Sequence, residues 1–358
     1  MTPDTASRLV VVDARMARRR RTGVATYIRE LRDALAEAGP GDVRVEWRAG
    51  PPALPRRGRL TSLGNLALDL AWLHVWLPLA AWRGRAAAIH APVNWAPWWS
   101  PCPVVVTVHD LSWERTPDAY PAGFRRYARI FGRRSARRAR VVIAVSGATA
   151  EDLATLYGVR RDRLRVVPYG IRVDDAPDEP REPFVLSVGE LHPRKRLPAL
   201  VEGHGLYLES APPDPPPCRL VIAGAGGSDE EAVRRAAGSG CDLLGFVAPE
   251  RLVDLYRRAT LLAYPSAYEG FGLPVLEAMA HGCPALVARN SSLPEVGGEV
   301  ALYLDDPTPA GIARRLAEVL ADRAALEERG RASRRHAATF AWPVAAAATL
   351  DAYREAMR

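Results

Sequence analysis

The chain has 358 residues, of which 48% are hydrophobic and 25% are charged. This composition excludes a disordered or fibrous chain, and the length suggests two domains, each large enough to bury its own core. The four cysteines show no CxxC spacing, which favours free thiols over a zinc site. The polar first residues and the short apolar run after them do not resemble a signal peptide, so we expect a cytoplasmic protein.

The formal net charge of +8 is divided unevenly along the chain. Residues 1–173 hold 29 arginines and 14 acidic residues, a balance of +15, whereas residues 174–358 have a balance of −7. A basic half indicates a negatively charged surface as a partner, and membrane phospholipid and nucleic acid both qualify. Because the chain carries no recognised nucleic-acid motif, we expect no nucleic-acid partner.

Residues 1–173 predict a first domain in which strands and helices alternate. The spacing of Tyr27, Ile28, Leu31 and Leu35 predicts a helix over residues 24–38. Short apolar runs predict strands at residues 9–13, 88–90, 104–108, 141–145 and 165–168. This alternation is typical of an open parallel sheet, that is, of a Rossmann-like α/β domain.

Three segments of this half carry surface chemistry. Residues 66–82 are the most apolar, but Asp69, His74 and Pro78 interrupt them, so we expect one buried or interfacial helix that is too short to span a bilayer. Residues 124–140 predict an arginine-rich helix, which is either a solvated face or a site for anionic lipid head groups. A tryptophan cluster at residues 95–99 either packs internally or lines an acceptor site.

An acidic, proline-rich linker at residues 174–183 predicts the start of a second domain, which we expect to end at residue 340. Its strands are predicted at residues 184–189, 219–223, 242–244, 261–264 and 285–287, with helices between them. A last helix is predicted over residues 342–357. Two Rossmann-like domains would bind ligands at the carboxyl ends of their strands.

The most informative segment is residues 263–285, which read as a strand, a glycine loop, a helix and a second strand. Pro274 suits a first helical position, which would place Glu277 in the first turn and Glu269 in the loop before it. A helix N-terminus attracts phosphate, and carboxylates beside it are useful when the ligand also carries hydroxyls. A sugar nucleotide has both groups. The alternative is a crossover helix whose acids only favour its own dipole.

A second informative position is Lys195, the one lysine among 49 basic residues. It lies in a loop that follows the predicted strand 184–189, where a cation can neutralise a leaving diphosphate. An ammonium acts there as a compact point charge, unlike the planar guanidinium of arginine. The alternative is a solvated basic turn.

These strings, together with SSLPEV at residues 291–296, resemble the donor-site signature of retaining glycosyltransferases of family four. The resemblance is to bacterial mannosyl- and rhamnosyltransferases, and it implies the GT-B fold, in which two Rossmann-like domains face each other across a cleft. It implies transfer of a hexose from a GDP-, UDP- or dTDP-sugar to a sugar, lipid-linked or small-molecule acceptor, without metal or cofactor. It also implies that residues 341–358 form a helix that returns to the first domain, 1–173, after the nucleotide-sugar domain, 174–340.

The resemblance also implies roles for single residues. Glu269 and His109 would lie by the transferred sugar, and Glu277 would bind the ribose hydroxyls. Glu190 stands where the family has an arginine, so Arg194 or Arg196 would have to compensate. The implied catalytic residues are His109, Glu269 and Lys195. The implied donor-binding residues are Gly23, Arg194, Lys195, Phe246, Val247, Gly270, Phe271, Gly272, Leu273 and Glu277.

Two other interpretations remain at this point. The chain could be a non-enzymatic protein that binds nucleotide sugars or an anionic surface. In either interpretation, a basic first half that binds anionic lipid implies a cytoplasmic protein located peripherally at the inner face of the membrane. A protein that had lost its activity should have lost some of the residues that carry the chemistry. This chain retains all four of them: His109, Lys195, Glu269 and Glu277. A phosphorylase on the same fold is disfavoured, because the single lysine lies in the diphosphate loop and not at a pyridoxal site.

Overall fold

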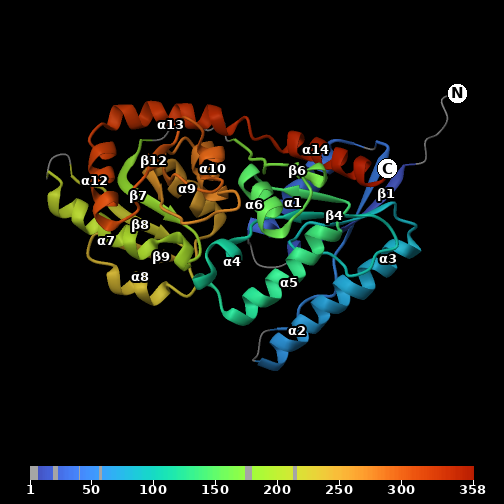
Figure 1. The fold of residues 1–358 in the computed structure, drawn as a ribbon. Helices are drawn as coiled ribbons and strands as arrows, with labels where there is room; N and C mark the ends of the chain where they lie inside the picture. Colours follow the sequence, from blue (N-terminus) through green and yellow to red (C-terminus); the bar gives the residue numbers. More distant parts are fainter. Residues whose placement is uncertain (1–6, 19–22, 40, 56–58, 174–179, 213–215) are drawn as a thin grey trace. The chain divides into compact units, whose positions relative to one another are not determined.

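The computed structural model describes residues 7–18, 23–39, 41–55, 59–173, 180–212 and 216–358. The chain forms two compact units (Figure 1). Unit 1 comprises Met1–Glu114, Pro121–Gly170 and Ala341–Arg358, and unit 2 comprises Arg115–Tyr120 and Ile171–Phe340. The division after Gly170 falls three residues before the boundary expected from the sequence, and a six-residue segment of the first half belongs to unit 2.

Unit 1 is built on a six-stranded parallel sheet with the strand order β2-β1-β3-β4-β5-β6. Its strands are β1 (Arg8–Asp13), β2 (Val43–Arg48), β3 (Ala88–Ala91), β4 (Val104–Val108), β5 (Val141–Ala144) and β6 (Leu164–Val166). Its main helices are α1 (Gly23–Glu37), α2 (Arg59–Ala71), α3 (Leu77–Arg83), α4 (Ser112–Arg115), α5 (Ala122–Arg138), α6 (Gly147–Tyr157) and α14 (Trp342–Ala356). The C-terminal helix α14 packs on α1 and β5, so the end of the chain is part of this unit (Figure 1).

The apolar helix of unit 1 is longer than the sequence predicts. α2, a π-helical turn η2 (Trp72–Trp76) and α3 follow one another without a break. The expected interruption at Pro78 does not occur, because Pro78 is at the start of α3, just after the π-helical turn, where a missing backbone N–H costs little. By length and composition alone, the stretch Leu63–Arg83 is able to cross a membrane, which corrects the expectation that it is too short.

Unit 2 repeats the same architecture, with the parallel strand order β12-β11-β10-β7-β8-β9. Its strands are β7 (Glu182–Val188), β8 (Arg219–Ala223), β9 (Cys241–Gly245), β10 (Ala259–Tyr264), β11 (Ala285–Ala288) and β12 (Leu302–Leu304). Its helices are α7 (Leu197–Ser210), α8 (Glu230–Ala236), α9 (Pro249–Arg258), α10 (Leu273–Ala280), α11 (Leu293–Gly297), α12 (Pro309–Leu320) and α13 (Arg323–Ala337).

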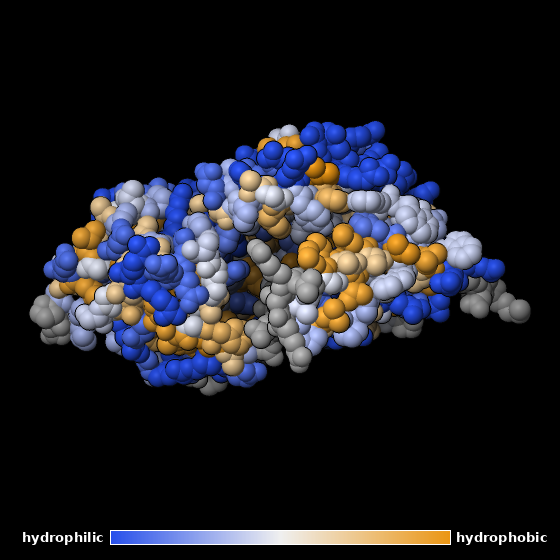
Figure 2. Space-filling model, turned by 90° about the horizontal axis from the view of Figure 1, so that it is seen from below, coloured by the Kyte–Doolittle hydropathy of each residue, from blue (hydrophilic) through white to orange (hydrophobic). Residues whose placement is uncertain are grey.

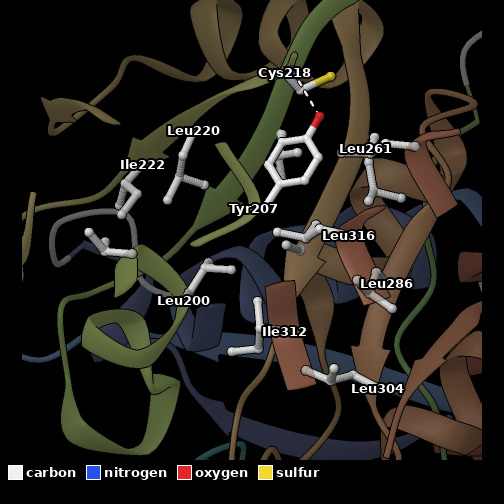
Figure 3. Close-up of a cluster of buried hydrophobic side chains, with 14 of the residues drawn as sticks. Leu200, Tyr207, Cys218, Leu220, Ile222, Leu261, Leu286, Leu304, Ile312 and Leu316 are labelled. Carbon is white, nitrogen blue, oxygen red and sulfur yellow. Dashed lines mark hydrogen bonds between the residues drawn. The ribbon is translucent and has the colours of Figure 1, made fainter. Parts of the chain in front are cut away.

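One face of the unit 2 sheet is closed by α7 and α12, which pack against each other and onto the strands (Figure 3). Leu200 and Ile312 from these helices meet Ile222 and Leu261 from β8 and β10. The Tyr207 hydroxyl accepts a hydrogen bond from the Cys218 backbone N–H, so the ring is buried without losing its polar partner. This core fixes β7 and β10 side by side.

The two parallel α/β units confirm the predicted fold class. Every predicted strand is present. Two strands were missed: β2, an edge strand that alternates with Arg44, Glu46 and Arg48, and β12, which has only three residues. Both lie at sheet edges, where a strand needs fewer buried side chains and so leaves a weaker signal.

Candidate functional site

Two loops at the carboxyl ends of neighbouring strands carry the predicted donor residues of unit 2. β7 pairs with β10 in parallel, with Val185 opposite Leu261. The loop after β7 contains the short 3₁₀ helix η5 (Pro193–Lys195), and the loop after β10 contains Glu269. Because parallel strands end at the same edge of a sheet, the two loops meet there.

The loops bring three charges into direct contact. The Lys195 ammonium lies 2.6 Å from Glu269 Oε1, and a guanidinium nitrogen of Arg194 lies 2.7 Å from the same oxygen. Lys195 also donates to the Tyr264 hydroxyl at the end of β10, and its Nζ lies 4.4 Å from the centre of that ring. Lys195 and Glu269 are 6% and 7% exposed, so the pair is almost fully shielded from water. The sequence predicted both residues but not their contact.

The electrostatics of this cluster keep Glu269 ionised. Burial by itself would raise the pKa of Glu269, but the charges of Lys195 and Arg194 and their hydrogen bonds lower it to about 2. The cluster holds one carboxylate between two cations. It therefore carries net positive charge, which suits a diphosphate.

A third loop, after β11, fixes the backbone around Glu269. Ser291 accepts a hydrogen bond from the Glu269 N–H, at 3.0 Å. The buried Ser292 hydroxyl lies 2.9 Å from the carbonyl oxygen of Glu269 and 2.7 Å from that of Phe271. The sequence pointed to the SSLPEV string through its resemblance alone. In the structure its two serines, with strained backbone at Ser291 (φ 46°), position the Glu269 loop.

The loop after β7 is held from its other side by glycines. A Cβ on Gly224 would lie 1.8 Å from the Gly189 carbonyl oxygen, and one on Gly227 would lie 2.2 Å from the Leu191 carbonyl oxygen. Only glycine allows this approach. The glycine-rich string after β8, a weak signal in the sequence, thus supports the segment that leads to Lys195.

Glu277 lies in α10, but not where the sequence predicted it. The helix begins at Leu273, after Gly272 in a left-handed conformation (φ 106°), so Glu277 is the fifth helical residue and no acidic residue occupies the first turn. The prediction was wrong because Pro274 is the second helical residue and not the first. Glu277 Oε2 accepts a hydrogen bond from the Tyr256 hydroxyl at 3.0 Å. Burial raises the pKa of Glu277 to about 7, against the lowering effect of that bond.

The other predicted donor residues of unit 2 lie in two places. Gly270, Phe271, Gly272 and Leu273 form the end of the Glu269 loop and the start of α10, and the Phe271 ring packs against Phe340. Phe246 and Val247 follow β9, which lies two strands from β7 on the side away from β10. The Phe246 side chain is 74% exposed. A ligand that reached both places would cross the carboxyl ends of β10, β7, β8 and β9.

His109, the predicted catalytic residue of unit 1, directly follows β4 and is buried. Its Nε2 donates to the Pro92 carbonyl oxygen at 3.0 Å, because a carbonyl can only accept, and its Nδ1 therefore accepts from the Tyr169 hydroxyl at 2.5 Å. Burial lowers the pKa of His109, so the ring is neutral at pH 7. Both ring nitrogens are thus already bonded within unit 1, and a ligand contact through either one requires an exchange of partners.

The sequence missed a buried polar network beside His109. His90 Nδ1 lies 2.8 Å from the Tyr353 hydroxyl of α14, and His90 Nε2 lies 2.8 Å from Thr107 Oγ1. Tyr27 of α1 lies 3.3 Å from the same Thr107 oxygen, and its ring meets the His109 ring edge-on. Histidine in a buried strand is a faint signal, and only the folded C-terminal helix supplies the partner.

Gly23, the last predicted donor residue, opens α1 and is exposed. No heavy atom of a described residue lies within 4 Å of the position of a Cβ on Gly23. Among the described residues, no group of three His, Cys, Asp or Glu side chains is placed to hold a metal ion.

The fold and site define a protein with two nucleotide-binding-type α/β units. Two family profiles match it: Glycosyltransferase Family 4 over residues 21–175 and Glycosyl transferases group 1 over residues 174–336. The chain belongs to glycosyltransferase family 4, with the GT-B fold. It is a glycosyltransferase.

Curated relatives agree with this assignment. The chain is 29% identical to the O-antigen chain mannosyltransferase B of Escherichia coli over 70% of each chain. It is 30% identical to the D-inositol 3-phosphate glycosyltransferase of Streptomyces bingchenggensis over 81% of this chain and 67% of that one. With the corresponding enzyme of Nocardia farcinica, the identity is 33%, but the match spans only 52% of the relative.

Solved structures show the same fold at lower identity. The sucrose-phosphate synthase of Thermosynechococcus elongatus superposes with a TM-score of 0.74 and 19% identity, over 97% of this chain and 98% of that one. A HepE protein of Anabaena in complex with UDP and glucose gives a TM-score of 0.66 and 17% identity, over 96% and 99%. At these identities the likeness supports the fold alone.

Proposed function

We propose that this enzyme transfers a hexose from a nucleotide sugar to an acceptor hydroxyl with retention of the anomeric configuration. The observation that carries the proposal is the contact of Lys195 with Glu269 at the carboxyl ends of β7 and β10. A cation for a leaving diphosphate and a carboxylate for sugar hydroxyls are adjacent there, beside the start of α10.

Different residues of the site bind different parts of the nucleotide-sugar donor. Lys195 and Arg194 neutralise the diphosphate. Arg194 takes the role of the family's usual arginine, whose position in this chain is occupied by Glu190. Glu269 accepts hydrogen bonds from the hexose hydroxyls, and Glu277 accepts them from the ribose. The backbone of residues 270–273 contacts sugar and phosphate, and that of Phe246 and Val247 contacts the base. From unit 1, Gly23 contacts phosphate and His109 the hexose.

The ion pair of the unliganded protein is consistent with these roles. Without donor, Glu269 is the counter-charge of Lys195 and Arg194. When donor binds, the diphosphate takes over as counter-charge for the cations, and the hexose hydroxyls donate to Glu269. Each of these three charges therefore keeps a polar or charged partner in both states, which avoids the large cost of an unpaired buried charge.

Chemistry at this site needs no protein base. The acceptor hydroxyl oxygen attacks the anomeric carbon on the same face of the sugar that the diphosphate leaves. The bond from that carbon to the phosphate oxygen breaks, and the leaving oxygen takes the acceptor proton. The protein contributes by positioning and by stabilising the diphosphate charge.

The relatives suggest the class of acceptor. One carries the name of a polysaccharide-chain mannosyltransferase and others that of an inositol phosphate glycosyltransferase. We propose that the acceptor is a sugar hydroxyl or a comparable polyol, free or lipid-linked, and that a mannose or rhamnose donor is the first to test.

The test is slow donor hydrolysis by the purified protein, followed by proton NMR, across UDP-, GDP- and dTDP-hexoses. The proposal predicts turnover of at least one donor, with the released sugar first appearing in the donor's own anomeric form. Release in the opposite form would refute retention. Tight donor binding without any turnover, with or without polyol acceptors, would favour the non-enzymatic binding protein.

A further inference from the structure

Exposed apolar side chains gather on the long helix of unit 1. Among the described residues, Leu63–Arg83 is the stretch that is long and apolar enough to cross a membrane, yet only 22% of its apolar 18-residue window is buried. Figure 2 shows hydrophobic residues (orange) concentrated on the side of unit 1 that carries α2 and α3. Its strongly exposed large apolar side chains are Leu63, Leu66, Val75, Trp76 and Trp82.

The same helix is anchored in the protein along its other side. Trp72, Leu73, Leu77 and Ala81 pack into a core cluster with Leu9, Val11 and Ile89 of the sheet. A helix that gives one side to a protein core is not surrounded by lipid, so it does not cross a bilayer as a free span. It can lie along a membrane surface with its remaining apolar side chains inserted.

Two further tryptophans extend the apolar area beyond the helix. Trp98 and Trp99 are 48% and 47% exposed. The Trp98 ring lies 4.5 Å from that of His74, between centroids, and the Trp99 indole N–H donates to the His74 carbonyl oxygen at 2.8 Å. These contacts tie the tryptophan loop to η2. Indoles of this kind, apolar but with one polar end, are enriched at membrane interfaces.

Arginines of α5 border this area. Trp98 stacks on Phe131 of α5 at 5.5 Å between ring centroids, and Arg138 donates to the Trp98 carbonyl oxygen at 3.2 Å. Arg133 and Arg134 of the same helix are exposed, with no ion-pair partner among the residues the structure describes. Apolar side chains beside arginines match the acyl boundary and the anionic head groups of a phospholipid leaflet.

We propose that this area, formed by Leu63, Leu66, Val75, Trp76 and Trp82 together with Trp98 and Trp99 and here named the α2–α3 surface, docks on an anionic phospholipid bilayer. The apolar side chains insert at the head-group boundary, and the α5 arginines contact the head groups. A second copy of the chain is a poorer occupant, because a symmetric contact would bring the two arginine borders together. The inference is independent of the donor assignment, since the surface lies on a part of unit 1 that the donor residues do not use.

Flotation with vesicles tests the proposal. The full chain is mixed with phosphatidylcholine vesicles, with or without phosphatidylglycerol, at low salt and at about 0.5 M NaCl, where charge attraction is screened. We expect binding to the anionic vesicles that falls at high salt but is not abolished, because inserted apolar side chains are not screened. Absence of binding to anionic vesicles at low salt would overturn the proposal.

Matched variants locate the contact. Leu66→Glu/Trp76→Glu should reduce vesicle binding by about tenfold or more, because two charges would enter the apolar boundary. Val344→Glu changes an apolar residue on α14 that is more exposed (65%) than Leu66 or Trp76, and it should leave binding unchanged. Circular dichroism checks that both variants are folded. Equal vesicle binding by the wild type and both variants would show that the α2–α3 surface does not make the contact, and it would refute the proposal.

Two measurements separate the alternatives. Lipids brominated near the head group should quench tryptophan fluorescence, and Trp76→Phe/Trp82→Phe should lose much of that quenching. Bound protein should be released from vesicles by alkaline carbonate, and retention after this treatment would indicate a true membrane span and refute surface docking. A dimer in sedimentation analysis that Leu66→Glu/Trp76→Glu dissociates would assign the surface to a second copy and also refute the proposal.

Discussion

Lys195 and Glu269 are 74 positions apart in the sequence and form a buried hydrogen-bonded ion pair of 2.6 Å. The pair joins the loops that follow two adjacent parallel strands, and Arg194 shares the same carboxylate oxygen. Buried ion pairs are costly to form and more costly to break. A fold that retains one at the carboxyl edge of its sheet, with net positive charge, fits a site whose ligand brings the missing anion.

Removing the ammonium tests the role of Lys195. Lys195→Ala should lower kcat by about 100- to 1000-fold, the usual loss when one stabilising group is removed from a charge-developing site. Its melting temperature should change little, because Glu269 keeps Arg194 as a partner. Lys195→Arg should rescue only in part, since a planar fork differs from a point charge in reach.

The competing assignment of that role is to Arg194. If Lys195→Ala retains full turnover while Arg194→Ala loses it, the diphosphate cation is Arg194. Steady-state kinetics of both variants with the same donor decide this.

Removing the Glu269 carboxylate, unlike removing the Lys195 ammonium, should lower the stability of the folded protein. Glu269→Gln leaves Lys195 buried without an anion, so the free energy of unfolding should fall by about 3–5 kcal/mol. Because the folded pKa is lowered to about 2, the stability from this ionisation is present above the unfolded value of 4.5 and lost as pH falls towards 2. Urea unfolding at pH 7 and pH 4 should show a smaller pH effect in the variant than in the wild type.

Removing the Glu277 carboxylate should weaken donor binding. Glu277→Ala should cost about 1–3 kcal/mol of donor affinity, the value of a hydrogen bond to a charged group. Calorimetric titration with a nucleotide sugar measures this, and an unchanged Kd would exclude Glu277 from the ribose contact.

The raised pKa of Glu277 predicts a pH dependence of donor affinity. Ribose hydroxyls donate to the ionised carboxylate best, and the unliganded pKa is about 7. Affinity should therefore rise about tenfold between pH 6 and pH 8, and Glu277→Gln should remove this slope. Nucleotide sugars are the right probe, because their phosphates do not titrate in this range.

The same shift has a consequence for stability without ligand. The folded protein binds the Glu277 proton more tightly than the unfolded chain, so this contribution to stability is full below 4.5 and is lost as pH rises through 7. At pH 8, Glu277→Gln should be more stable than the wild type by about 1–3 kcal/mol. This advantage of the variant should be at least as large at pH 8 as at pH 5. A variant that loses stability with rising pH as steeply as the wild type would contradict the assignment.

Close backbone packing at Gly224 predicts a further sensitivity. Gly224→Ala places a methyl group 1.8 Å from the Gly189 carbonyl oxygen, so the loop leading to Lys195 has to move, at a cost of about 1–3 kcal/mol. Gly205→Ala in α7 is the control, because no atom lies within 4 Å and alanine is favoured in helices. The first variant should lose donor affinity and the second should not; equal affinities would separate the glycine string from the donor site.

The sequence was sufficient for the fold and for placing the predicted donor residues Lys195 and Glu269 in loops after strands, but not for their contact. Alternating periodicity predicts parallel strands, and parallel strands place Lys195 and Glu269 at one edge. It was not sufficient for their surroundings. Tyr264 belongs to a predicted strand and Tyr256 to a helix predicted between strands, and a tyrosine hydroxyl gives no signal of its partner until the chain is folded.

Other errors have local causes. One misplaced helical residue at Pro274 moved Glu277 out of the first turn. Pro78 and Asp69 seemed to interrupt the apolar helix of unit 1, but a π-helical turn precedes the proline, and the helix continues. Which apolar residues of that helix face the core and which face outward follows from tertiary packing, so the α2–α3 surface was beyond sequence reasoning.

The central claim, that unit 2 binds a nucleotide sugar through Lys195, Glu269 and Glu277, is tested most directly by thermal stabilisation across a panel of UDP-, GDP- and dTDP-sugars. A ligand at about 100 times its Kd should stabilise the folded protein by about 2.7 kcal/mol and raise Tm by several degrees. The account predicts that at least one nucleotide sugar does so in the wild type, and that Glu277→Ala and Lys195→Ala both reduce the shift. No shift with any nucleotide sugar at millimolar concentration, or an undiminished shift in both variants, would contradict it.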